Sequence, residues 1–160
     1  MTVVADSSVL IGLSSIGRLD LLHGLFGPVV IPGAVFLEVV EAGGGRAGAR
    51  AVGEATWIER RAVADPAAVD LLRAELDAGE AEAIVLARQI RARHVILDNR
   101  EPRIVARRLG LTVIGTVGVL VECKRRGLIQ SCRTVLSQLV AQGFWLSPDV
   151  VAAAVRAAGE

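Results

Sequence analysis

Aromatic residues, cysteine and histidine are all scarce in this chain of 160 residues. Aromatic side chains make up only 3% of it, which argues against recognition of nucleic acid by stacked bases and favours phosphate contacts. The cysteines, Cys123 and Cys132, lack the paired spacing of a zinc site. The histidines, His23 and His94, stand in no recognisable motif with a nucleophile or an orienting acid. Zinc-finger and Ser–His–Asp or Cys–His chemistry are therefore not expected.

Long hydrophobic runs are also missing, although hydrophobic residues make up 52% of the chain and the mean hydropathy is +0.52. The uncharged, mainly apolar stretch at 109–121 covers 13 residues, whereas a spanning helix needs roughly 20. The N-terminus has no basic region before its apolar run, and Asp6 interrupts that run early. We therefore expect a cytoplasmic protein that has a strongly apolar core and no membrane partner.

The charge is small in sum but uneven in distribution. The net charge is +1, yet the window 88–126 carries ten basic and three acidic residues, which leaves −6 on the rest of the chain. A basic half beside an acidic site suits a polyanionic substrate. The alternative is a solvated, arginine-rich helix surface.

Apolar segments of strand and helix length alternate along the chain. The expected strands are 2–6, 28–31, 57–63, 94–98 and 112–114. The expected helices are 18–26, 32–41, 47–55, 66–76, 80–90, 102–109, 117–126, 131–141 and 147–157. This alternation predicts an α/β fold with a central parallel sheet flanked by helices. We expect one domain over 1–160, with a core over about 1–127 and a helical C-terminal extension over about 128–160.

Two of the apolar runs end abruptly in an aspartate. Asp6 follows the first run, and Asp98 follows another run 92 residues later. Open α/β sheets place ligand sites at the carboxyl ends of their strands, so the two carboxylates are expected to meet there. They would repel each other unless a cation lies between them. Hard divalent cations prefer oxygen ligands, which makes Mg²⁺ or Mn²⁺ the expected cofactor.

Further acids stand in or beside apolar helical runs. Glu38 is surrounded by apolar residues and is expected near the sheet, where burial of a charge is costly without a cation or donor. Glu41 adjoins three glycines and suits a solvated position. Glu80 opens a helix, where an acid is favourable in any case. Glu80 and Glu82 point to different faces of that helix, so they cannot be equivalent ligands.

Four stretches together resemble the PIN domain, a metal-dependent nuclease fold used by the VapC-type toxins of bacterial toxin–antitoxin pairs. The stretches are 4–8, 32–39, 79–84 and 95–99. They occur in the order typical of the family and span most of the chain. The segment from 127 to 144 resembles the helical tail of a PIN subfamily known mainly from sequence, DUF3368.

The resemblance implies a set of functional residues. The four metal-binding acids would be Asp6, Glu38, Glu80 and Asp98. Ser8 would correspond to the small hydroxyl residue that supports the first aspartate, by a hydrogen bond to its carboxylate. Glu80 is preferred as the third acid because it lies 18 residues before Asp98, and Glu82 is the fallback. The third acid is Glu where the family more often has Asp. The fourth lies in Leu-Asp-Asn, where many relatives have Thr-Asn-Asp or Thr-Arg-Asp.

The resemblance also implies an activity and partners. It implies an Mg²⁺- or Mn²⁺-dependent endoribonuclease that acts on RNA, and the toxin of a toxin–antitoxin pair. A cognate antitoxin would then block the acidic cleft, and the toxin would form a homodimer. Arg100 and Arg103 directly follow the last acid and are candidates for contact with the substrate phosphate.

Three other interpretations remain. A catalytically silent PIN-like module that binds RNA or a protein could keep the same acids. A phosphotransfer enzyme of the haloacid-dehalogenase type would need a second acid two residues after Asp6, where this chain has Ser8. A nucleotide-binding Rossmann domain would need Gly-x-Gly-x-x-Gly after the first strand, a motif that is absent from 6–11.

Overall fold

Five short strands form one sheet at the centre of the fold, and each neighbouring pair of strands runs parallel. The computed structural model describes residues 2–160. The spatial order of the strands is β3-β2-β1-β4-β5. Their bounds are β1 Val3–Ala5, β2 Val29–Ile31, β3 Ile58–Arg60, β4 His94–Ile96 and β5 Val113–Ile114. The predicted α/β class with a central parallel sheet is confirmed.

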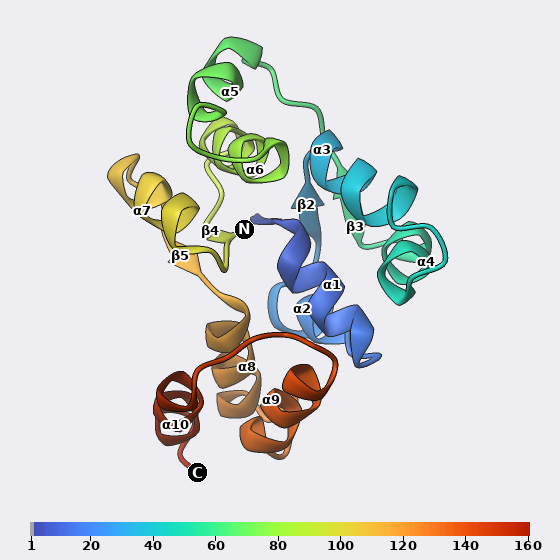
Figure 1. The fold of residues 1–160 in the computed structure, drawn as a ribbon, viewed down its shortest axis with the longest axis vertical. Coiled ribbons are helices and arrows are strands. Elements are labelled where there is room, and N and C mark those ends of the chain that lie inside the picture. The colour runs from blue at the N-terminus through green and yellow to red at the C-terminus, as the bar shows by residue number, and fades with distance from the viewer. Residues whose placement is uncertain (1) are drawn as a thin grey trace.

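Helices cover both faces of this sheet. They are α1 (Ser7–Ser15), α2 (Asp20–Phe26), α3 (Gly33–Phe36), α4 (Ala47–Glu54), α5 (Pro66–Leu72), α6 (Ala78–Gln89), α7 (Arg100–Arg108), α8 (Thr116–Arg125), α9 (Cys132–Ala141) and α10 (Pro148–Ala157). A π-helical turn, η1 (Leu37–Glu41), continues α3. Figure 1 shows α5 and α6 at one end of the molecule and α8, α9 and α10 at the opposite end. Within residues 2–160, no helix is long and apolar enough to cross a membrane.

The strand side chains divide between two hydrophobic cores, because successive residues of a strand point to opposite faces. Val4 and Val95 lie in the core that α6 and α7 cover. Val3, Ala5 and Ile96 lie in the other core, which is completed by α1, α2, α8 and α9. Both faces of the central strands are therefore buried, and this accounts for their continuous apolar sequence.

Helix α1 is not among the expected elements. Six of its nine residues are buried, so it lacks the polar face that identifies a surface helix in sequence. Its Gly12 allows a close approach, because a Cβ there would lie 2.9 Å from the ring of Phe144. All the expected helices and all five expected strands are present, most of them shorter than expected by a few residues.

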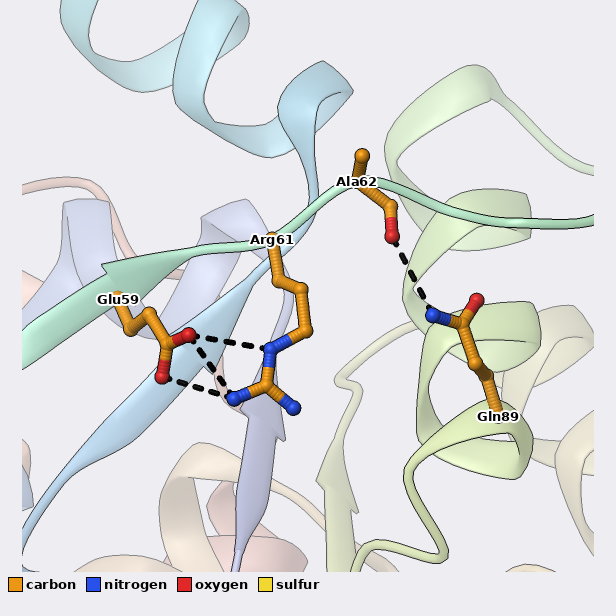
Figure 2. Close-up of polar contacts among 4 residues, drawn as sticks. All are labelled: Glu59, Arg61, Ala62 and Gln89. Carbon is orange, nitrogen blue, oxygen red and sulfur yellow. Dashed lines mark hydrogen bonds and ion pairs between the residues drawn. The ribbon is translucent and has the colours of Figure 1, made fainter.

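Hydrogen bonds connect the segment after β3 to α6 (Figure 2). Arg61 and Glu59 form an ion pair at 2.9 Å beside the end of β3. The side-chain amide of Gln89 donates to the carbonyl of Ala62 at 3.4 Å and accepts from the N–H of Ala64 at 2.8 Å. Because both halves of the Gln89 amide are used, the crossing from β3 to α5 is held against α6.

The chain changes its direction across the sheet between β1 and β4. From β1 it moves outward through β2 to β3, and it then returns to the opposite side of β1 as β4 and continues to β5. Open α/β sheets bind ligands at such a switch point, beyond the carboxyl ends of the strands. The residues that follow β1 and β4 are thus placed where a functional site is expected.

Candidate functional site

Asp6 and Asp98 follow the two strands at the switch point, as the sequence predicts. Ala5 lies opposite Ile96 in the β1–β4 pairing, and the N–H of Asp6 donates to the carbonyl of Ile96 at 3.2 Å. Asp98 stands two residues beyond the end of β4. Both aspartates therefore lie at the same edge of adjacent strands.

Three donors hold the Asp98 carboxylate. Ser8 Oγ donates to Oδ2 at 2.9 Å, and Thr116 Oγ1 donates to the same oxygen at 2.7 Å. The Thr116 N–H donates to Oδ1 at 2.8 Å from the first turn of α8. Asp98 therefore links the ends of β4 and β5 to the starts of α1 and α8. A carboxylate can accept about four hydrogen bonds, so this arrangement leaves room for one more ligand.

The prediction that Ser8 supports Asp6 is wrong, because its hydroxyl donates to Asp98 instead. Residues two positions apart at a helix start point in different directions, and α1 directs Ser8 towards β4. The Ser7 hydroxyl donates to Asp6 Oδ1 at 3.5 Å.

The Asp6 carboxylate is buried among other acids. Only 5% of Asp6 is exposed. Burial raises its pKa from 3.8 to about 7, and the charges of Asp77, Glu80 and Glu38 act in the same direction, against a hydrogen bond from the Ser7 backbone. The charge on Asp6 is therefore costly unless a cation offsets it.

Glu80 is held in a capping box at the start of α6. Its N–H donates to the Asp77 carboxylate at 2.8 Å, while its own Oε2 accepts from the Asp77 N–H at 3.2 Å. Its other oxygen accepts from the Asn99 side-chain amide at 2.9 Å. Glu80 is 6% exposed and contributes to the raised pKa of Asp6. Its carboxylate thus faces the site and has a fixed orientation.

Glu82 points away from Glu80, as the helical spacing predicts. Its Oε1 accepts from the Ala34 N–H at 3.2 Å, in the first turn of α3. The N–H groups of a first helical turn have no acceptor within the helix, and the Glu82 carboxylate provides one for Ala34.

Glu38 reaches the site from η1 but is not buried. The prediction that it lies buried near the sheet is wrong, because its residue is exposed. Glu41, in the same turn, is exposed as predicted. A Cβ placed on Gly79 would lie 3.2 Å from Asp6 Oδ1 and 3.3 Å from Glu38 Oε2. The two carboxylates therefore approach each other over a backbone position without a side chain. The π-helical turn that carries Glu38 is of a kind found frequently at functional sites.

The two arginines that follow Asp98 differ in their surroundings. Arg100 is exposed at the start of α7. The Arg103 guanidinium donates to the carbonyl of Leu97 at 2.7 Å, and its partial burial lowers its pKa. Arg103 thus also stabilises the backbone that precedes Asp98.

A cleft of about 910 Å³ opens from the Asp98 side of the site. Ser8, Asp98, Arg100 and Arg103 are among the residues that line it. The segment between α9 and α10 also lines it, including Trp145. The cleft therefore joins the acidic edge of the sheet to the C-terminal helices.

Three further residues complete the site, and the sequence analysis above does not single them out. They are Asp77, Asn99 and Thr116. Asp77 could have been found from the Asp-x-x-Glu spacing of a capping box. Thr116 directly follows the Ile114-Gly115 end of a strand, which mirrors the position of Ser7 after β1. Asn99 has no such signal, because its contact with Glu80 depends on the tertiary fold.

Comparison with protein families identifies this arrangement. The model of the family DUF3368, described as a PIN domain, matches residues 2–160. The chain belongs to this PIN-domain family. PIN domains are generally nucleases and typically use divalent metals, which agrees with an acidic site at the switch point. A search of the curated proteins found no match.

The donor set of this PIN domain has the oxygen chemistry that a hard cation prefers. Its side chains are carboxylates, and oxygen ligands are what Mg²⁺ and Mn²⁺ prefer. As the side chains stand, no group of three or more Asp, Glu, His or Cys residues within 2–160 is arranged to hold a metal. Mg²⁺ usually keeps several water ligands and needs only one or two carboxylates, which suits this arrangement.

The raised pKa of Asp6 predicts how the metal-free PIN domain responds to pH. The unfolded chain releases the Asp6 proton near pH 4, whereas the folded chain keeps it until about pH 7. The free energy of unfolding should therefore fall by as much as about 4 kcal/mol between these values and stay low above them. Urea titrations in EDTA from pH 4 to 8 measure this. Asp6→Asn should flatten the profile, and an equal slope in wild type and variant would contradict the assignment.

Proposed function

We propose that this PIN domain is an endoribonuclease that hydrolyses RNA phosphodiester bonds with Mg²⁺ or Mn²⁺. The metal-binding carboxylates are those of Asp6, Glu38, Glu80 and Asp98. The observation that carries the proposal is the burial of Asp6 beside three other acids, which raises its pKa to about 7. Such an arrangement disfavours the charged carboxylate in the free protein, and a bound cation would reverse that.

The residues differ in what they contribute. Asp6 and Asp98 are the principal ligands, and hydrogen bonds from Ser8 and Thr116 fix the Asp98 carboxylate. Glu80 is oriented by Asn99 and adds negative charge. Glu38 is exposed and accepts no hydrogen bond from residues 2–160, so it is free to take the proton of an attacking water. The metal would lower the pKa of that water and offset the charge of the phosphate.

We further propose that the protein is the toxin of a toxin–antitoxin pair. The acidic site lies at the carboxyl ends of β1 and β4, and its Asp98 lines a cleft, so an antitoxin segment with a basic residue could cover the site. An amine or guanidinium placed against Asp6 would offset the same charge as the metal. The toxin role and homodimerisation are expectations from the family resemblance.

A catalytically silent module that binds RNA or a protein is the second candidate. The observation that favours it is that no three or more Asp, Glu, His or Cys side chains of residues 2–160 are arranged to hold a metal ion. Glu80 and Glu82 also have structural roles at helix starts, which would preserve them without catalysis.

A Mn²⁺ titration separates the two candidates. Calorimetry should detect binding by the wild type and none by Asp6→Asn. Gly79→Ala should weaken binding roughly ten- to a hundredfold, because its methyl group would lie within 3.3 Å of both the Asp6 and the Glu38 oxygens. The same change should leave the helix intact, since Ala favours a helix over Gly by about 1 kcal/mol.

Gly53→Ala is the matched control for Gly79→Ala. Gly53 lies in helix α4, and its added methyl group would meet only Val40 Cγ1 at 3.5 Å. This control should bind Mn²⁺ like the wild type. Undetectable Mn²⁺ binding by a folded wild type, or equal binding by Asp6→Asn, would favour the silent module.

A further inference from the structure

Trp145 is the most exposed large hydrophobic side chain among residues 2–160, at 82%. It lies between α9 and α10. The other tryptophan, Trp57, is half-buried and stacks on His23 with the ring centroids 5.1 Å apart. Exposed single hydrophobic residues are common, but a largely exposed indole that lines a cleft can offer its faces to a ligand.

The neighbours of Trp145 are anchored, so its exposure does not come from a loose segment. Phe144 and Leu146 both pack against the hydrophobic core. The Phe144 ring lies against Gly12 of α1, and the Phe144 N–H donates to the Leu139 carbonyl at 3.0 Å. Side chains of the segment thus alternate inward, outward and inward. This alternation directs Trp145 out of the core.

Trp145 shares its cleft with Asp98 of the acidic site. Ser8, Arg100 and Arg103 also line this cleft. The Asp98 carboxylate for a metal, two guanidinium groups for phosphates and an aromatic ring for a base therefore line one cleft. These are the three kinds of group that contact the parts of a nucleotide chain.

We propose that Trp145 stacks on one unpaired base of the RNA strand whose phosphodiester bond lies at the acidic site. The inference rests on the function proposed above for that site. Every base has a face that can stack on an indole, whereas in a duplex those faces are covered by neighbouring bases. The protein therefore prefers single-stranded RNA or an unpaired loop. The scarcity of aromatic residues argues against stacking on several bases, but a single ring at this position is enough to stack on one base.

Tryptophan fluorescence tests the stacking independently of cleavage. In a Trp57→Phe variant, Trp145 is the only tryptophan. A single-stranded oligoribonucleotide, added in EDTA, should quench its fluorescence, and the same strand annealed to its complement should quench it far less. In the wild-type background, Trp145→Ala should weaken binding of the labelled single strand roughly ten- to a hundredfold by fluorescence anisotropy.

Two further variants control this comparison. Trp145→Phe keeps a smaller ring and should retain part of the affinity. Leu71→Ala removes another exposed hydrophobic side chain, 79% exposed on α5 and outside this cleft, and should bind like the wild type. With Mn²⁺ present, Trp145→Ala should raise KM for single-stranded RNA more than it lowers kcat.

Several results would overturn the stacking. One is equal affinity of Trp145→Ala and wild type, and another is binding by anisotropy without any quenching. Self-association in sedimentation that Trp145→Ala abolishes without RNA would assign the ring to a protein interface instead. Quenching and weakened binding without cleavage by the wild type would overturn the nuclease proposal and leave the stacking intact.

Discussion

Asp6→Asn is expected to reduce metal-dependent RNA cleavage roughly a thousandfold or more while stabilising the metal-free protein. The activity falls because the amide replaces a charged ligand of the cation. The stability rises because the amide carries no charge in a buried position surrounded by Asp77, Glu80 and Glu38. At pH 8, in EDTA, the gain in unfolding free energy should reach as much as about 4 kcal/mol.

Two measurements on one preparation check this result: initial cleavage rates in Mn²⁺, and urea unfolding in EDTA. Asp70→Asn is a matched control, because Asp70 is exposed on α5. It should change neither quantity measurably. Full activity in a folded Asp6→Asn protein would refute the assignment of Asp6 as a metal ligand.

Asp98→Asn is expected to change stability in the opposite direction. It should lower the free energy of unfolding by about 2–4 kcal/mol, because charge-assisted hydrogen bonds from Ser8 and Thr116 are weakened. The amide group of Asn is itself a donor, so in either orientation it would face another donor, the hydroxyl groups of Ser8 and Thr116 or the N–H of Thr116. Thr116 is fully buried, so a donor that loses its acceptor cannot turn to water.

Thermal and urea unfolding of both Asn variants give the comparison. Thr116→Val should account for part of the Asp98→Asn loss, since it removes one of the three donors and keeps the shape of the side chain. Destabilisation by Asp6→Asn would contradict the unfavourable buried charge assigned to Asp6. An Asp98→Asn protein as stable as the wild type would contradict the stabilising hydrogen bonds assigned to Asp98. For this reason Asp6→Asn is the cleaner variant for activity assays.

The sequence predicts the fold well because strands and helices alternate with clear apolar runs. Asp6 and Asp98 are predictable for the same reason, since each lies within two residues of the end of a strand of the sheet. Helix α1 is not predictable from periodicity, because burial on most sides removes its polar face. Glu38 illustrates a second limit, since it stands within an apolar run and is nevertheless exposed in η1.

Hydrogen-bond partners are the least predictable part of the site. Ser8 is two residues from Asp6 in sequence but donates to Asp98, 90 residues away. Asn99 follows Asp98 directly but donates to Glu80. Such pairings depend on how neighbouring strands and helices converge at the switch point, which local sequence does not encode.

Cleavage of labelled single-stranded and structured RNAs tests the central claim most directly. Wild-type protein and Asp6→Asn, purified identically, are each incubated with Mn²⁺, Mg²⁺ or EDTA. We expect the wild type alone to cut, only with a metal present, and to prefer unpaired segments. Equal cutting by both proteins, or no cutting by a wild type that binds Mn²⁺, would contradict the claim that these carboxylates form a ribonuclease site.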